Sequence, residues 1–125
     1  MKKKLSKFLL LIILFASIST FSQSKILQIQ TFYKKNSPAK TSKTITFNKN
    51  SKVITIDGNR IPLTKVSFHY EFNDKYYNYA HHFVSVDCLD DSECVKSVNG
   101  SHIGLSVPLN SKQNALKFIT MLENL

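Results

Sequence analysis

After residue 22, most of the chain alternates apolar and polar residues at every second position. This period is typical of β-strands with one buried and one exposed face, because successive side chains point to opposite faces. The pattern is clearest from His102 to Leu109, where Ile103, Leu105 and Val107 are predicted to point inward together with Leu109. In chain order, the predicted strands cover residues 26–33, 44–47, 52–56, 61–72, 76–87, 95–98 and 102–109.

Short polar segments separate these strands. Asp57-Gly58 and Asn99-Gly100 are strong hairpin signals, because two-residue hairpin turns favour such pairs at their positive-φ positions. Residues 48–51 and 73–75 are turn clusters, and residues 34–43 are predicted to form a longer loop. The strands are therefore expected to pair in an antiparallel manner.

The period of the pattern changes near the C-terminus. Asn110 is a good N-cap, and Gln113 can complete a capping box with it. Apolar residues then recur every three or four positions, which predicts an amphipathic helix over residues 111–124. This helix needs a sheet face to cover its apolar stripe, which consists of Ala115, Phe118, Ile119, Leu122 and Leu125.

The order of about seven short strands and one terminal helix resembles the pleckstrin-homology-like superfold. The resemblance implies a mainly β, α+β fold, in which an antiparallel two-sheet roll or barrel is plugged by the helix. A single antiparallel sheet packed on the helix is the alternative. The resemblance also implies that the first loop contacts an anionic surface, whereas a solvated lysine loop is the ordinary alternative. The candidate anion-contacting residues are Lys34, Lys35, Lys40 and Lys43.

Residues 1–22 have the pattern of a secretory signal peptide. A cationic start with four lysines precedes the apolar run from Phe8 to Ala16, and Thr20 and Ser22 place small residues before a cut at Gln23. A retained membrane helix is the alternative, but the apolar run is too short to span about 30 Å of hydrocarbon. The mature chain is therefore predicted to be exported to the periplasm or the cell exterior without a transmembrane anchor.

Length and charge limit the remaining possibilities. Residues 23–125 are long enough for one small domain. The whole chain has 17 Lys and Arg against 8 Asp and Glu, but without the four leader lysines 13 against 8 leaves +5. This modest charge, together with export, argues against nucleic acid as a partner.

Cys88 and Cys94 are the two cysteines of the chain, and five residues separate them. In an oxidising compartment, two cysteines at this spacing are expected to form a disulfide that fixes a hairpin-like loop. A redox pair or a metal thiolate is the less favoured alternative. Reactive pairs are usually separated by two residues, and the acidic neighbours here disfavour the thiolate.

An aromatic stretch supplies the best candidate interaction surface. On the predicted strand over residues 76–87, alternation places one set of aromatic and histidine side chains on the outward face. A bulge or a second sheet that buries these rings is the alternative. The candidate interaction residues are His69, Tyr77, Tyr79, His81 and Phe83.

The sequence contains no motif that predicts catalysis, a metal site or a cofactor. It lacks a glycine-rich phosphate loop, a nucleophile elbow and a helical metalloprotease His pair. The adjacent His81 and His82 point to opposite faces of a strand and so cannot share one metal ion. We therefore expect a small exported binding or interaction module without catalytic activity, whose partner is another envelope protein or an anionic surface. An envelope structural or stress-related protein with no small ligand is the alternative, and a metal-dependent hydrolase is the least favoured.

Overall fold

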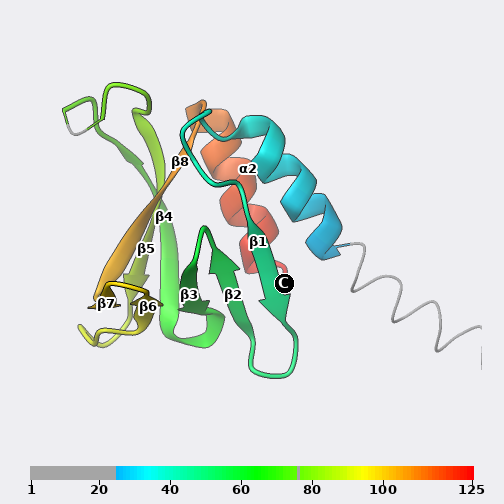
Figure 1. Cartoon of the computed structure of the whole chain (residues 1–125), viewed down its shortest axis with the longest axis vertical. Helices are drawn as coiled ribbons and strands as arrows, with labels where there is room; N and C mark the ends of the chain where they lie inside the picture. Colours follow the sequence, from blue (N-terminus) through cyan, green and yellow to red (C-terminus); the bar gives the residue numbers. More distant parts are fainter. Residues whose placement is uncertain (1–24, 76) are drawn as a thin grey trace, which may run out of the picture.

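A computed structural model describes residues 25–75 and 77–125. The predicted signal peptide, residues 1–22, lies outside the described residues, as does Tyr76. Within the described part, eight antiparallel strands form two sheets, and one helix lies near each end (Figure 1). The mainly β, two-sheet α+β prediction is therefore confirmed, but the sheets do not close into a barrel.

The larger sheet has the strand order β1-β2-β3-β6-β7. Its β2–β3 hairpin turns at Asp57 and Gly58, which have φ values of 50° and 85°. The predicted Asp-Gly turn is therefore confirmed. The strands of this sheet are β1 (Ile45–Asn48), β2 (Val53–Ile56), β3 (Asn59–Pro62), β6 (Val95–Ser97) and β7 (Gly100–His102).

The smaller sheet has the strand order β4-β5-β8 and consists of longer strands. These are β4 (Val66–Phe72), β5 (His82–Cys88) and β8 (Gly104–Leu109). β4 and β5 pair along their whole length, from Val66 opposite Cys88 to Phe72 opposite His82. Alternation along β5 sends Val84 and Val86 to the face covered by helix α2, and Phe83 to the opposite face, which we call the outer face.

Two predicted strands are interrupted where the chain passes from one sheet to the other. The stretch 61–72 divides at the 3-10 turn η1 (Leu63–Lys65), which follows Pro62 at the end of β3. The stretch 102–109 divides at Ile103, which is 64% exposed and not inward-facing as predicted. β8 then begins at Gly104, opposite Asp87. Glycine suits this position, because a Cβ atom there would lie 2.7 Å from the carbonyl oxygen of Val86.

The strand predicted over residues 26–33 is wrong, because this segment belongs to a helix that is described from residue 25 to residue 36. Ile29 fits both periods, but Ile26, Ile29 and Tyr33 share one helical face and are buried or half-buried. A strand would not have brought Ile26 and Ile29 to one side. Since the first described element is a helix, the element order of the described residues departs from the pleckstrin-homology-like one, and that resemblance is not confirmed.

The C-terminal helix α2 (Lys112–Glu123) confirms the predicted change of period. Its N-cap, however, is Ser111 and not Asn110, because the Ser111 hydroxyl accepts a hydrogen bond from the backbone N–H of Asn114 at 3.1 Å. The stripe of Ala115, Phe118, Ile119 and Leu122 is buried as expected.

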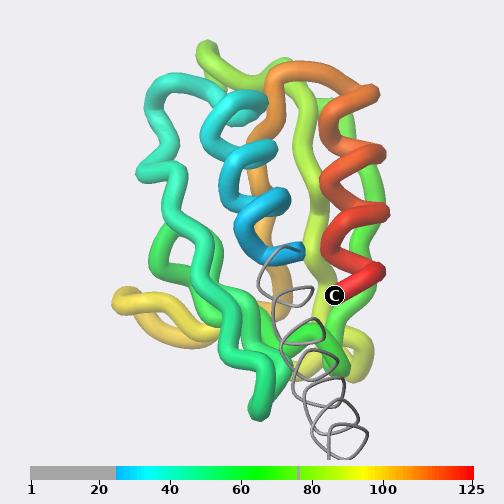
Figure 2. The backbone as a smooth tube through the Cα atoms, turned by 90° about the vertical axis from the view of Figure 1, so that its right-hand side faces the viewer, coloured from blue at the N-terminus to red at the C-terminus, as the bar shows by residue number. Residues whose placement is uncertain are grey.

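The core lies between the sheets and the two helices. α2 packs on β4, β5 and β8, and the N-terminal helix lies beside α2 (Figure 2). The ring of Phe118 stacks on that of Tyr33 with a centroid distance of 5.4 Å. No helix within residues 25–75 and 77–125 is long and apolar enough to cross a membrane.

Candidate functional site

Three of the predicted interaction residues form one aromatic cluster. The Tyr77 ring lies 5.4 Å from the Tyr79 ring and 5.7 Å from the Phe83 ring, measured between centroids. Tyr77 and Tyr79 are 45% and 40% exposed, whereas Phe83 is 3% exposed. Phe83 therefore forms the base of the cluster, and its predicted exposure is wrong.

The different exposure of these rings follows from where β5 begins. The predicted strand started at residue 76, but β5 starts at His82, and residues 77–81 form a loop. Tyr77 in this loop contacts Phe83 and so helps to cover it on the outer face of the sheet. Strand alternation therefore places Phe83 on the outer face, while the loop decides that it is buried.

A hollow of about 330 Å³ opens beside Tyr77 on the outer face. All three strands of the smaller sheet, or the segments next to them, contribute to its walls. Glu71 and Phe83 are direct partners across β4 and β5, and β8 supplies Ser106. The lining residues are Glu71, Asn73, Tyr77, Phe83 and Ser106.

The polar walls of this hollow differ in their hydrogen-bonding capacity. The Glu71 side chain offers acceptor oxygens, the Asn73 amide both donates and accepts, and the Ser106 hydroxyl does the same. The rings of Tyr77 and Phe83 supply the apolar part of the surface. The hollow can thus hold a small ligand that has both an apolar face and several hydroxyl or amide groups.

The two histidines predicted for this surface lie outside the hollow. His69 pairs with Asp87 through Nδ1 and Oδ2 at 2.9 Å, and both side chains are about half exposed. His81 contacts the edge of Phe72 at a centroid distance of 6.3 Å. Neither histidine lines the hollow.

A second aromatic contact lies on the opposite side of the sheet, at the start of α2, and was missed from the sequence. The Tyr70 hydroxyl and His82 Nδ1 are 2.8 Å apart, and the two rings stack at 6.0 Å. The Lys112 ammonium lies 5.3 Å from the centroid of the Tyr70 ring. The shared face of Tyr70 and His82 was visible in the alternation, but their contact depends on the register of β4 and β5.

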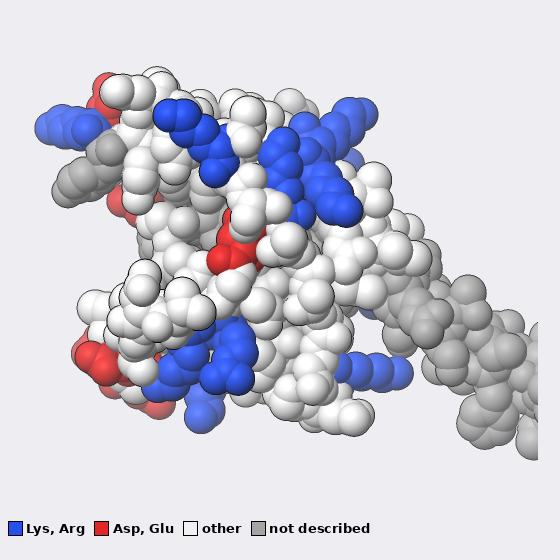
Figure 3. Space-filling model, in the orientation of Figure 1, with Lys and Arg blue, Asp and Glu red and all other residues white. Residues whose placement is uncertain are grey.

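The four candidate anion-contacting lysines do not share one loop. Lys34 and Lys35 belong to the last turn of the N-terminal helix, whereas Lys40 and Lys43 follow it. Lys43 donates to the carbonyl of Lys34 at 3.3 Å, and Lys40 lies 5.4 Å from the centroid of the Tyr79 ring. Basic side chains nevertheless gather over this end of the helix and the loop that follows (Figure 3).

The cysteine loop is closed as predicted. Cys88 and Cys94 form a disulfide with a Cα–Cα distance of 5.9 Å, and Cys88 lies at the end of β5. Asp90, Asp91 and Glu93 in the loop are exposed. Within the described residues, no group of three or more His, Cys, Asp or Glu side chains is placed to hold a metal ion.

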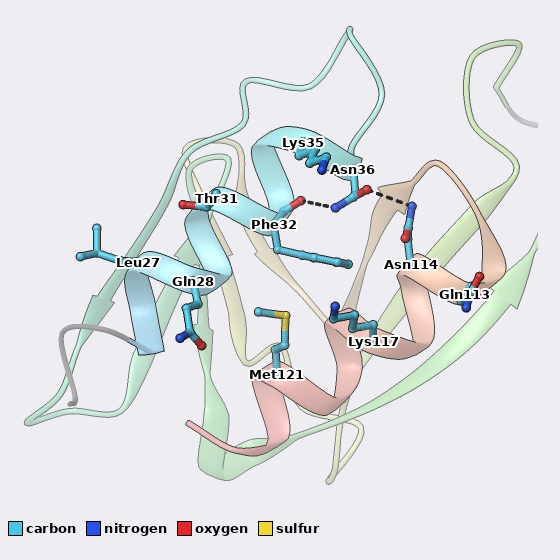
Figure 4. Close-up of a pocket in the computed structure, with 10 residues that line it drawn as sticks. All are labelled: Leu27, Gln28, Thr31, Phe32, Lys35, Asn36, Gln113, Asn114, Lys117 and Met121. Carbon is cyan, nitrogen blue, oxygen red and sulfur yellow. Dashed lines mark hydrogen bonds between the residues drawn. The ribbon is translucent and has the colours of Figure 1, made fainter.

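A larger groove runs between the N-terminal helix and α2 (Figure 4). Its volume is about 820 Å³. Figure 4 shows Phe32, Met121 and Lys117 pointing into the space between the helices, and Lys35 at the last turn of the N-terminal helix. The full lining consists of Leu27, Gln28, Thr31, Phe32, Lys35, Asn36, Gln113, Asn114, Lys117 and Met121.

Two of the concave surfaces of the described chain combine apolar and polar side chains. The first is the hollow beside Tyr77 on the outer face of the smaller sheet, and the second is the groove between the helices. Comparison of the chain with protein-family models, with curated proteins and with solved structures finds no match.

Proposed function

We propose that this chain is a small exported binding module without catalytic activity, and that its binding site is the hollow beside Tyr77. The sequence pattern of residues 1–22 and the disulfide between Cys88 and Cys94 support export. The ligand that suits the hollow best is a neutral sugar unit, such as one residue of an extracellular glycan.

The observation that carries this proposal is that two aromatic rings and three different polar side chains line the same hollow. A sugar ring has an apolar face of C–H groups that packs on an aromatic ring, and hydroxyl groups around its edge. Tyr77 is half exposed and supported from below by Phe83, so its position is already fixed before a ligand binds. Glu71, Asn73 and Ser106 offer acceptors and donors to the hydroxyl groups.

The hollow is also the right size for one sugar unit of a longer glycan. Its volume of about 330 Å³ is at the lower end of the range for ligand sites, and it opens to solvent. A glycan could therefore continue past Tyr79, whose ring contacts that of Tyr77.

The test is an NMR titration of the protein with neutral tetrasaccharides built from glucose, mannose or N-acetylglucosamine. We expect amide shifts near residues 71, 73, 77, 83 and 106 with at least one of them. Tyr77→Ala should weaken binding about tenfold, because a lost ring contact costs about 1.4 kcal/mol. Phe72→Ala is the matched control, since Phe72 is an exposed aromatic residue of β4 that does not line the hollow.

Two results would contradict the proposal. One is the absence of shifts with all three sugars at millimolar concentration. The other is binding that Phe72→Ala weakens as much as Tyr77→Ala does, because the contact would then not be specific to the hollow.

A further inference from the structure

The groove between the two helices has fixed walls. The helices run in opposite directions, because Asn36 near the end of one receives a hydrogen bond from Asn114 near the start of the other, at 3.2 Å. At the opposite end, the Lys25 ammonium donates to the carbonyl of Asn124 at 3.1 Å. The described helices are about twelve residues each, so the groove is about 18 Å long. It is held at both ends before any partner binds.

The floor of the groove is apolar and supported by the core. Phe32 is half-buried and stacks on the buried Phe118 with a centroid distance of 6.3 Å. Met121, also half-buried, lies beside it and can adapt to different shapes. Leu27, at the rim, is 59% exposed. Phe32 and Met121 therefore form an apolar strip on the floor of the groove.

Two lysines of the groove lining add positive charge beside this strip. Lys35 comes from one helix and Lys117 from the other, and the Lys117 ammonium lies 5.4 Å from the centroid of the Phe32 ring. Among the described residues that line the groove, none is acidic. Residues 25–36 and 112–123 together hold five lysines and one acidic residue, Glu123. Basic residues therefore outnumber acidic ones on the two helices.

We propose that this groove binds an acidic amphipathic helix of a partner protein. Apolar residues at positions i, i+3, i+4 and i+7 of that helix would pack on Phe32 and Met121. Acidic residues on its two flanks would face Lys35 and Lys117. The proposal concerns a different surface from the Tyr77 hollow and does not depend on it.

The shape and charge of the groove favour this occupant over two others. An open, straight groove between antiparallel helices fits a third helix along its length, whereas an anionic bilayer is flat and does not reach a recessed floor. A second copy of this chain would bring its own cationic helices against the cationic walls, and like charges facing each other disfavour that contact.

The test uses a fluorescein-labelled peptide about 14 residues long, with leucine at i, i+3, i+4 and i+7, glutamate on both flanks and alanine elsewhere. Fluorescence anisotropy should show binding to the mature chain that weakens as salt is added. Replacing both groove lysines, Lys35→Glu with Lys117→Glu, should weaken binding about tenfold or more. The matched control, Lys52→Glu with Lys65→Glu, changes the net charge equally outside the groove and should change binding less than about twofold.

Circular dichroism shows whether each variant is folded. If the charge-reversed pair unfolds, the milder pair Lys35→Gln with Lys117→Gln replaces it, because it removes the two charges without adding negative ones. The proposal is overturned if the control pair weakens binding as much as the groove pair, or if a peptide with lysine in place of glutamate binds equally well. It is also overturned if the acidic peptide fails to bind and vesicles of phosphatidylglycerol bind through the same two lysines. The same holds if the peptide fails and sedimentation experiments show that a second copy of the chain binds through them.

Discussion

The hydroxyl of Tyr33 donates a hydrogen bond to the carboxylate of Asp57, which is 24 residues later in the chain. Tyr33 is fully buried in the N-terminal helix, and Asp57 is the first residue of the β2–β3 turn. The other oxygen of Asp57 accepts from the Ser42 hydroxyl at 2.8 Å and from the backbone N–H of Thr44 at 2.9 Å. One carboxylate thus joins the N-terminal helix, the loop after it and the larger sheet.

Tyr33→Phe should lower the free energy of unfolding by about 1–2 kcal/mol, because it removes a buried hydrogen bond to a charged group. Urea unfolding followed by circular dichroism measures this loss. Tyr79→Phe is the control, because its ring is partly exposed. An equal loss in both variants would mean that the Asp57 contact does not contribute.

The buried position of the Tyr33 hydroxyl, with its bond to Asp57, should make the fold sensitive to alkaline pH. Burial raises the pKa of Tyr33 above its usual value of 10.0, and the hydrogen bond to Asp57 and its negative charge raise it further. Above about pH 10, the unfolded chain therefore releases the phenol proton while the folded chain keeps it, so stability falls as pH rises. Tyr33→Phe should show a shallower decline between pH 9 and 11, and parallel curves would contradict this assignment.

Removal of the disulfide should cost little. The bond joins Cys88 and Cys94, which are six positions apart in the chain. For so short a loop, the lower entropy of the cross-linked unfolded chain stabilises the fold by about 2 kcal/mol. The double variant Cys88→Ser and Cys94→Ser should therefore remain folded at 25 °C, with a lower urea midpoint. Thiol titration of the mature protein should find no free thiol, and two reactive thiols would disprove the bond.

Variants of the neighbouring residues Ser111 and Asn110 can test which of them is the N-cap of α2. Ser111→Ala should lower the free energy of unfolding by about 1 kcal/mol, because its hydroxyl accepts the hydrogen bond from Asn114. Asn110→Ala should have a smaller effect, since the Asn110 side chain is exposed and only its backbone N–H bonds to Asn36. If Asn110→Ala proves the more damaging, the helix begins one residue earlier, as the sequence predicted.

The aromatic cluster should respond unequally to truncation. Phe83→Ala should destabilise the fold by about 3 kcal/mol, because it empties a buried position. Tyr77→Ser and Tyr79→Ser remove partly exposed rings and should each cost about 1 kcal/mol or less. Thermal unfolding of the three variants measures the difference, and unfolding caused by Tyr77→Ser would show that this ring belongs to the core.

Local signals in the sequence determined many elements. The Asp57-Gly58 turn, the change of period that marks α2 and the spacing of the cysteines all depend on a few neighbouring residues. Such features are fixed by backbone preferences and side-chain period, so a single sequence is enough to find them. These local signals were enough to predict the mainly β class with a C-terminal helix, and they were enough to predict the disulfide.

Tertiary structure alone decided the first helix and both concave surfaces. Ile29 fits a strand and a helix equally well, and packing of Tyr33 on Phe118 is what favours the helix. Phe83 alternates outward along β5, yet a loop covers it, and one groove is lined by Lys35 and Lys117, which come from opposite ends of the chain. Such contacts join residues that are distant in sequence, and their free energy depends on how whole elements pack, which no local pattern contains.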